Sequence, residues 1–253
     1  MLQKSTLEFL TKLKENNNRD WFATNKKAFE TEQKLAKSFF TSVGEQLGKI
    51  DSIERVQIFR IYRDVRFSKD KAPYKNHFSV GFTRTKPMLR GGYYLHIEPG
   101  GSFVGGGFWE PNAADLHRIR KEFEMDDAEI RTIIADTTFK KIFGELKGEE
   151  LKTAPKGFDK THPAIDLIRK KQYLLTRSFS DKEVSAPKVI APKVIGALVL
   201  LMVPLSVEAL GAVAVSPPVK LKVPLAAPRA KVPVLLKVTA LVIVPELALR
   251  AKL

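Results

Sequence analysis

The large aromatic residues of this chain are confined to its first 179 positions. All 16 Phe, 5 Tyr and 2 Trp of the 253 residues lie before residue 180. Aromatic side chains bury the most surface per residue and anchor hydrophobic cores. We therefore expect one packed domain over residues 1–184 and a different kind of sequence over residues 185–253.

The segment 185–253 combines two conflicting signals. It contains nine of the fifteen prolines, which break helices and central strands, yet it is too apolar for a solvated linker. A frameshifted or disordered continuation is the favoured interpretation. A membrane segment over Gly196–Val215 is the second, since about 20 residues span a bilayer, but Pro204 and Glu208 interrupt it. A genuine hydrophobic domain is the third.

Charge and cysteine content narrow the classes of function. Residues 1–184 carry 34 Lys and Arg against 26 Asp and Glu, a net charge of +8. This balance suits anionic partners such as phosphate esters or nucleic acid. The chain has no Cys, which excludes disulfides, thiolate catalysis and iron–sulfur clusters. Residues 1–5 do not begin an apolar signal segment, so a cytoplasmic location is expected.

The hydrophobic periodicity predicts helices, then strands, then helices again. Apolar residues at helical spacing predict helices over residues 2–13 and 21–47, and later over 113–134, 139–146 and after Pro163. Extended patterns predict strands over residues 56–62, 78–83, 93–98, 102–104 and 172–177. This order predicts an α+β fold with a mainly antiparallel sheet.

A dense group of charged and aromatic residues lies between residues 60 and 77. Its members are Arg60, Arg63, Asp64, Arg66, Phe67, Asp70, Lys71 and Tyr74. With residues 16–22, 94–101, 105–107 and 162–167, this pattern resembles the bacterial family called domain of unknown function 2461, through about residue 184. The resemblance implies no catalytic residue or ligand, because none is established for that family.

Five members of this group are candidates for binding an anion. The guanidinium groups of arginine donate paired hydrogen bonds to phosphate or carboxylate oxygens. If the chain turns after residue 63, the cations converge. The candidate anion site then consists of Arg60, Arg63, Arg66, Lys71 and Tyr74. In the alternative interpretation, the same charges form an ion-pair lattice that only holds the fold.

Three residues are candidates for catalysis: Asp64, Asp70 and His96. The two aspartates are placed to orient the cations, to bind a divalent metal or to act as a base. His96 and Glu98 share one face of a strand and are candidates to join them around Mg²⁺ or Mn²⁺. A solvated polar strand face is the alternative and is favoured by the pattern. No metal site and no cofactor is assigned from the sequence.

Two further features carry less weight. Gly105–Gly107 follows a predicted strand without the Gly-Lys-Ser/Thr of a phosphate-binding loop, and we interpret the run as a bulge or a sharp strand exit. His77, His117 and His162 show no metal-ligand spacing among themselves.

Three classes of function remain open. The first is an enzyme or binding protein for a phosphorylated or otherwise anionic compound. The second is a nucleic-acid-binding module that stacks bases on Tyr62, Phe67 and Tyr74. The third is a structural or interaction protein. Neither a reaction nor an oligomeric state follows from the sequence.

Overall fold

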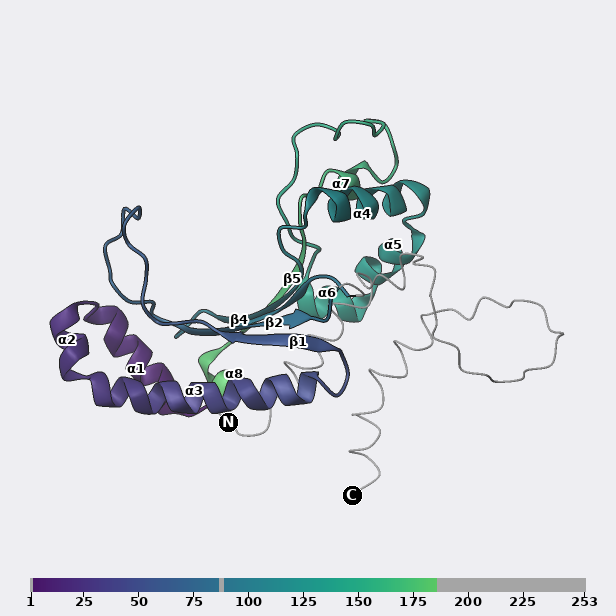
Figure 1. Ribbon diagram of the computed structural model, residues 1–253. Coiled ribbons are helices and arrows are strands. Elements are labelled where there is room, and N and C mark those ends of the chain that lie inside the picture. Colours follow the sequence, from purple (N-terminus) through teal and green to yellow (C-terminus); the bar gives the residue numbers. More distant parts are fainter. Residues whose placement is uncertain (1, 87–88, 186–253) are drawn as a thin grey trace, which may run out of the picture. The chain divides into compact units, whose positions relative to one another are not determined.

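The computed structural model describes residues 2–86 and 89–185 and confirms the α+β class. At its centre is a five-stranded antiparallel sheet in which each strand pairs with its neighbours in sequence order (Figure 1). The strands are β1 (Ile53–Ile58), β2 (Phe78–Arg84), β3 (Gly92–Ile97), β4 (Ser102–Phe108) and β5 (Tyr173–Phe179).

Helices precede the sheet and also fill the connection between its last two strands. The first group is α1 (Lys4–Glu15), α2 (Arg19–Thr24) and α3 (Lys26–Leu47). The connection holds α4 (Ala113–Met125), α5 (Ala128–Ala135), α6 (Thr137–Phe143) and α7 (Ile165–Ile168), and α8 (Asp181–Ser185) follows β5. The single helix predicted over residues 21–47 is wrong in one respect, because the chain breaks at Asn25 between α2 and α3.

Side-chain caps fix the start of α2, α4 and α6. The side chains of Asn18 and Asn112 accept hydrogen bonds from the Trp21 and Asp115 amides at 2.9 Å, and that of Asp136 accepts one from the Phe139 amide at 2.8 Å. Such caps satisfy backbone N–H groups that have no partner within the helix. The predicted start of α4 at Asn112 is therefore confirmed.

One face of the sheet forms the main hydrophobic core. Val80, Leu95 and Val104 are partners in one register row across β2, β3 and β4, and all three are buried in the main core with side chains of the helices. Figure 1 shows α3 running along this face. The alternation of strand side chains therefore directs the residues between these positions to the opposite face.

The first strand ends earlier than predicted. The extended pattern of residues 56–62 predicts a strand through Tyr62, but β1 stops at Ile58. Beyond it, residues 60–77 leave the sheet as a long loop, which we call the arm (Figure 1). Ile61 is buried in the main core, and Tyr62 pairs with Tyr74 in an isolated antiparallel bridge that closes the base of the arm.

The glycine run of residues 105–107 lies inside β4, so its interpretation as a bulge or strand exit is wrong. All three glycines pair in unbroken register with β3 on one side and β5 on the other. Gly107 has a φ of 127°, and a Cβ atom there would lie 2.0 Å from the carbonyl oxygen of Tyr173. Only glycine fits at that position.

The tail predicted for residues 185–253 lies outside the described residues except for Ser185, which ends α8. The candidate membrane segment Gly196–Val215 is likewise outside them. Within residues 2–86 and 89–185, no helix combines the length and the apolar character needed to cross a bilayer.

Candidate functional site: a groove on the glycine face of the sheet

The sheet face opposite the main core carries unusually small residues, and we call it the glycine face. One register row crosses all five strands on this face: Gln57, Gly81, Tyr94, Gly105 and Thr176 are successive partners. A second row places Thr83, Gly92, Gly107 and Leu174 side by side. Because four of these positions are glycines, the face is hollowed along the middle strands.

Gly105 is not required by backbone geometry in the way that Gly107 is. A Cβ atom at Gly105 would approach nothing closer than 3.6 Å, which is ordinary van der Waals contact. At Gly81 the nearest atom would be a ring carbon of Phe59 at 3.5 Å. A methyl group at either position would thus be in ordinary contact with its neighbours, and both glycines line a hollow space in front of the sheet.

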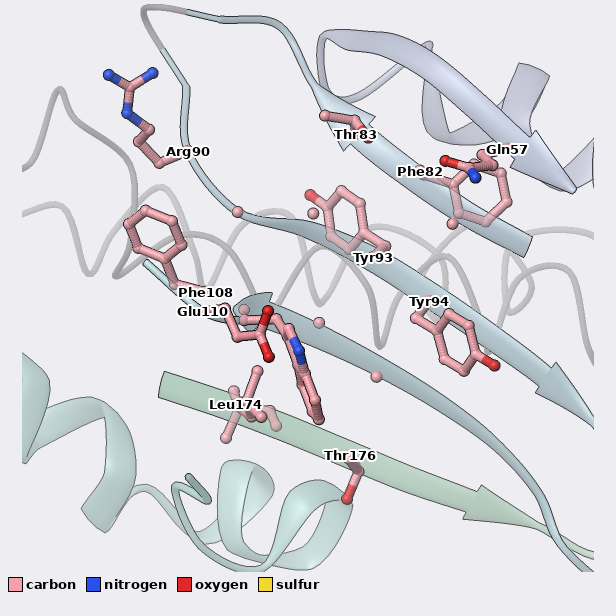
Figure 2. A pocket seen from close by; sticks show the side chains of 18 of the residues that line it. Gln57, Phe82, Thr83, Arg90, Tyr93, Tyr94, Phe108, Glu110, Leu174 and Thr176 are labelled. Atoms are coloured by element: carbon pink, nitrogen blue, oxygen red, sulfur yellow. The ribbon is translucent and has the colours of Figure 1, made fainter. Parts of the chain in front are cut away.

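This space forms a groove of about 950 Å³, which we call the glycine groove (Figure 2). Figure 2 shows Gln57, Tyr94 and Thr176 along the groove and Arg90 at one end. Aromatic rings contribute much of its wall, namely those of Phe59, Tyr94, Phe103, Phe108 and Trp109. Trp109 is 65% exposed. Concave sites of this size with apolar walls and a few polar groups are typical of small-molecule binding.

Charged residues lie at the end of the groove next to α4. Arg90 Nε is 3.0 Å from Asp115 Oδ2, and this carboxylate is buried beneath the N-terminus of α4. Lys86 also lines the groove, and its ammonium has no ion-pair partner in the part of the chain that the structure describes. Glu110 contributes a carboxylate to the same end.

A cluster of titratable side chains lies next to the opposite end, on the same face. His96 Nε2 is 2.9 Å from Glu98 Oε2, and His96 Nδ1 is 3.2 Å from the hydroxyl of Tyr94. The ring of His77 lies against that of His96 with centroids 4.0 Å apart. Tyr94 belongs to the groove wall, so the cluster of His77, His96 and Glu98 is continuous with it.

Burial governs the electrostatics of this end. Burial first, and the neighbouring His96 second, lower the pKa of His77 to about 4. Burial and then the charge of Arg60 lower the pKa of Lys75, whose ammonium lies 5.6 Å from the centre of the Phe59 ring. Among the described residues, neither Lys75 nor Arg60 forms an ion pair. Two cations therefore lie near this end, together with the aromatic wall and the carboxylate of Glu98.

The other predicted arginines pair locally within the arm. Arg66 donates two hydrogen bonds to Asp64, at 3.0 and 2.7 Å, and these lower the pKa of that carboxyl group. Arg63 contacts Asp70, whose pKa is lowered first by the Ala72 amide and then by this arginine. The structure thus brings together Arg63 with Asp70 and Arg66 with Asp64, as two separate exposed pairs.

Two further predicted site residues serve the arm itself. Lys71 Nζ donates to the carbonyl oxygen of Val65 at 3.1 Å. Tyr74 is buried, its ring stacks on Phe22 at a centroid distance of 3.9 Å, and burial raises its pKa. The Asn17 side chain bonds both the amide and the carbonyl of Tyr74, which ties the base of the arm to the end of α1. Tyr74 therefore packs inside the protein.

Of the predicted site residues, His96 contacts the groove wall through Tyr94, and Arg60 acts on Lys75 nearby. The catalytic roles of Asp64 and Asp70 stay predictions. His77 was not expected at the site from the sequence. Its neighbour His96 is 19 positions away and comes close only through the pairing of Phe78 with Ile97. The groove was missed as well. Its signal is the alternation of small residues at every second position of β2 and β4.

One family model matches this chain. A family model described as "Conserved hypothetical protein (DUF2461)" matches residues 5–205, which is more than three quarters of the chain. Searches of the curated proteins and of the solved structures found no match.

Proposed function

This chain belongs to the DUF2461 family of conserved hypothetical proteins, and from that premise we propose that it binds an anionic small molecule with a flat apolar body in the glycine groove. The observation that carries the proposal is the groove of about 950 Å³ floored by Gly81 and Gly105. Its volume and its aromatic walls suit a compound of this kind.

The anionic group is assigned to the end of the groove beside Lys75. The ammonium of Lys75 lies over Phe59 and is half-buried, and Arg60 acts on it from nearby. A partly buried cation without an ion-pair partner, such as Lys75, is stabilised by an external anion. We therefore assign the anion to Lys75 and the exposed Arg60, since Arg63 and Arg66 already pair with Asp70 and Asp64.

We further propose that the protein catalyses a reaction of the bound compound. His96 lies beside the groove wall and is held between Tyr94 and Glu98. When no metal ion is bound, a histidine fixed in this way can accept or donate a proton during catalysis. The binding step is the part that a direct experiment tests first.

The experiment uses the fluorescence of Trp109, which lines the groove. A Trp21→Phe variant leaves Trp109 as the single tryptophan, because the chain has two. Phenyl phosphate is the probe. Inorganic phosphate and phenol are the controls, because each resembles one half of the probe. We expect a saturable change with phenyl phosphate and much weaker responses to the two halves. Lys75→Met should weaken the binding of phenyl phosphate about tenfold, which is ~1.4 kcal/mol, because a charge-assisted hydrogen bond is lost. No response to any of the three probes would contradict the proposal.

A second candidate function is supported by the arm. The ring of Phe67 is 95% exposed, and the guanidinium of Arg66 lies 5.9 Å from its centre. An exposed aromatic ring beside cations is the arrangement that stacks and holds single-stranded nucleic acid. Tyr74 takes no part in this candidate, because it is buried. Salt-dependent binding of a single-stranded oligonucleotide that Phe67→Ala abolishes would favour this function.

A further inference from the structure

We propose that His77, His96 and Glu98 form a binding site for one divalent transition-metal ion of the zinc class. The three side chains each offer one ligand atom, and these atoms lie within 4.8 Å of one another. They come from the start of β2 and the end of β3, which pair side by side. The metal site stands on its own geometry and does not depend on the ligand proposed for the groove.

The distance between two of the ligand atoms is close to what a shared metal ion needs. His96 Nε2 and Glu98 Oε2 are 2.9 Å apart. Nitrogen and oxygen ligands bind Zn²⁺ at about 2.0–2.2 Å, so two ligands of a tetrahedral ion lie roughly 3.3–3.6 Å from each other. These two side chains therefore need to separate by roughly half an ångström. The ligand atom of His77 lies within 4.8 Å of both, so the half-buried His77 ring must move closer to bind the same ion.

Neighbouring polar groups orient both of these ligands. The hydroxyl of Tyr94 lies 3.2 Å from His96 Nδ1, the ring nitrogen that faces away from Glu98. Asn76 Nδ2 donates to Glu98 Oε1 at 2.7 Å and leaves Oε2 directed at His96. Partners of this kind fix the tautomer and orientation of metal ligands and raise their affinity for the ion.

The donor set selects the class of metal. Two imidazoles and one carboxylate suit Zn²⁺, Fe²⁺ or Co²⁺, whereas Mg²⁺ and Ca²⁺ prefer oxygen ligands alone. Three protein ligands also leave coordination positions for water or another ligand, as in catalytic rather than structural metal sites. This site takes His77 as its third ligand, whereas from the sequence Asp64 or Asp70 was the candidate to join His96 and Glu98.

The alternative is a pair that binds no metal, in which His96 Nε2 donates a hydrogen bond to Glu98. The chain offers matched controls that separate the two cases. It has four histidines and no cysteine, so His117 and His162 are the two histidines outside the cluster. No thiolate competes for the ion.

The test is metal binding by the full chain without a histidine tag, after removal of metal with EDTA. We expect one Zn²⁺ per chain by calorimetry and visible absorption bands from Co²⁺ bound at the same site. His77→Ala and Glu98→Gln should each weaken Zn²⁺ binding at least tenfold, whereas His117→Ala and His162→Ala should leave it unchanged. Circular dichroism checks that each variant is folded.

A second measurement needs no variant. Proton NMR of the wild-type chain follows its four histidine rings during addition of Zn²⁺. Shifts at His77 and His96 at one equivalent, with His117 and His162 unaffected, support the site. Absence of Zn²⁺ binding, or binding that survives the substitution of both His77 and Glu98, would overturn the proposal.

Discussion

Tyr94 pairs directly with Gly105 across β3 and β4, so its ring lies beside a position that has no side chain. The same tyrosine pairs with Gly81 on its other side. Its hydroxyl contacts His96, one position further along the face. This single row therefore joins the floor of the glycine groove to the cluster of titratable side chains beside it.

Filling the groove floor should abolish binding without unfolding the protein. In Gly105→Leu the added side chain projects into the open space in front of the sheet, where phenyl phosphate is expected to bind. We expect loss of the Trp109 fluorescence response and a melting temperature close to that of the wild type. Ser178→Leu is the control, because it places the same side chain on the glycine face at an exposed position outside the groove lining. Equal effects of the two changes on binding would contradict the assignment of the groove.

Alanine at two neighbouring glycines should have opposite effects on stability. Gly105→Ala places a methyl group at ordinary contact distances and should be neutral or stabilise the fold by up to ~1 kcal/mol, since alanine restricts the unfolded chain. Gly107→Ala should destabilise it by more than ~2 kcal/mol, because a positive φ is combined with a clash against the Tyr173 carbonyl. Urea unfolding of both variants measures the difference. Similar stabilities of the two variants would contradict the backbone conformation of Gly107 and its close contact with Tyr173.

The ion pairs of the arm and of the interior should differ sharply in their effect on stability. Arg84 Nε lies 2.7 Å from Asp51 Oδ2, and both side chains are at most 10% exposed, with the Tyr93 hydroxyl on the same carboxylate. Arg84→Met strands this buried carboxylate and should lower the free energy of unfolding by ~3–5 kcal/mol. Arg66→Met breaks an exposed pair and should change it little. A large loss of stability in Arg66→Met would favour the interpretation of the arm as a structural ion-pair lattice.

Truncation tests the predicted boundary near residue 184. Both core clusters lie within residues 2–185, and Val184 of α8 is buried in the main one. A chain that ends after Ser185 should therefore unfold in a single cooperative thermal transition. A second chain that ends at residue 205 retains the whole of the family match. If only this longer chain unfolds cooperatively, the domain boundary proposed at residue 184 is wrong.

The fold class and most elements followed from the sequence because they depend on local periodicity. The cap at Asn112 and the turn between β3 and β4 are both short-range signals. The end of β1 at Ile58 was missed, because the β-branched and aromatic residues beyond it suit either a strand or a buried loop. Ile61 belongs to the arm and is buried in the main core, and local pattern does not distinguish this case from a strand.

The candidate site depended on contacts that a linear sequence does not display. His96 was found because Glu98 shares its strand face, whereas His77 joins them only through strand pairing. The arginines of the arm drew attention by their density, yet Arg63 and Arg66 each have an aspartate within reach in the same loop. A glycine groove is still harder to predict, because it is defined by side chains that are missing from three adjacent strands.

The most direct test of the account is to map where phenyl phosphate binds. Amide chemical shifts of the ¹⁵N-labelled chain, recorded during titration, report on every described strand at once. We predict the largest changes at Gly81, Gly105 and Thr176 on the groove floor, together with Lys75 at its end. Changes confined to residues 63–72 of the arm, with the groove glycines unaffected, would contradict the central claim that the glycine face is the binding surface.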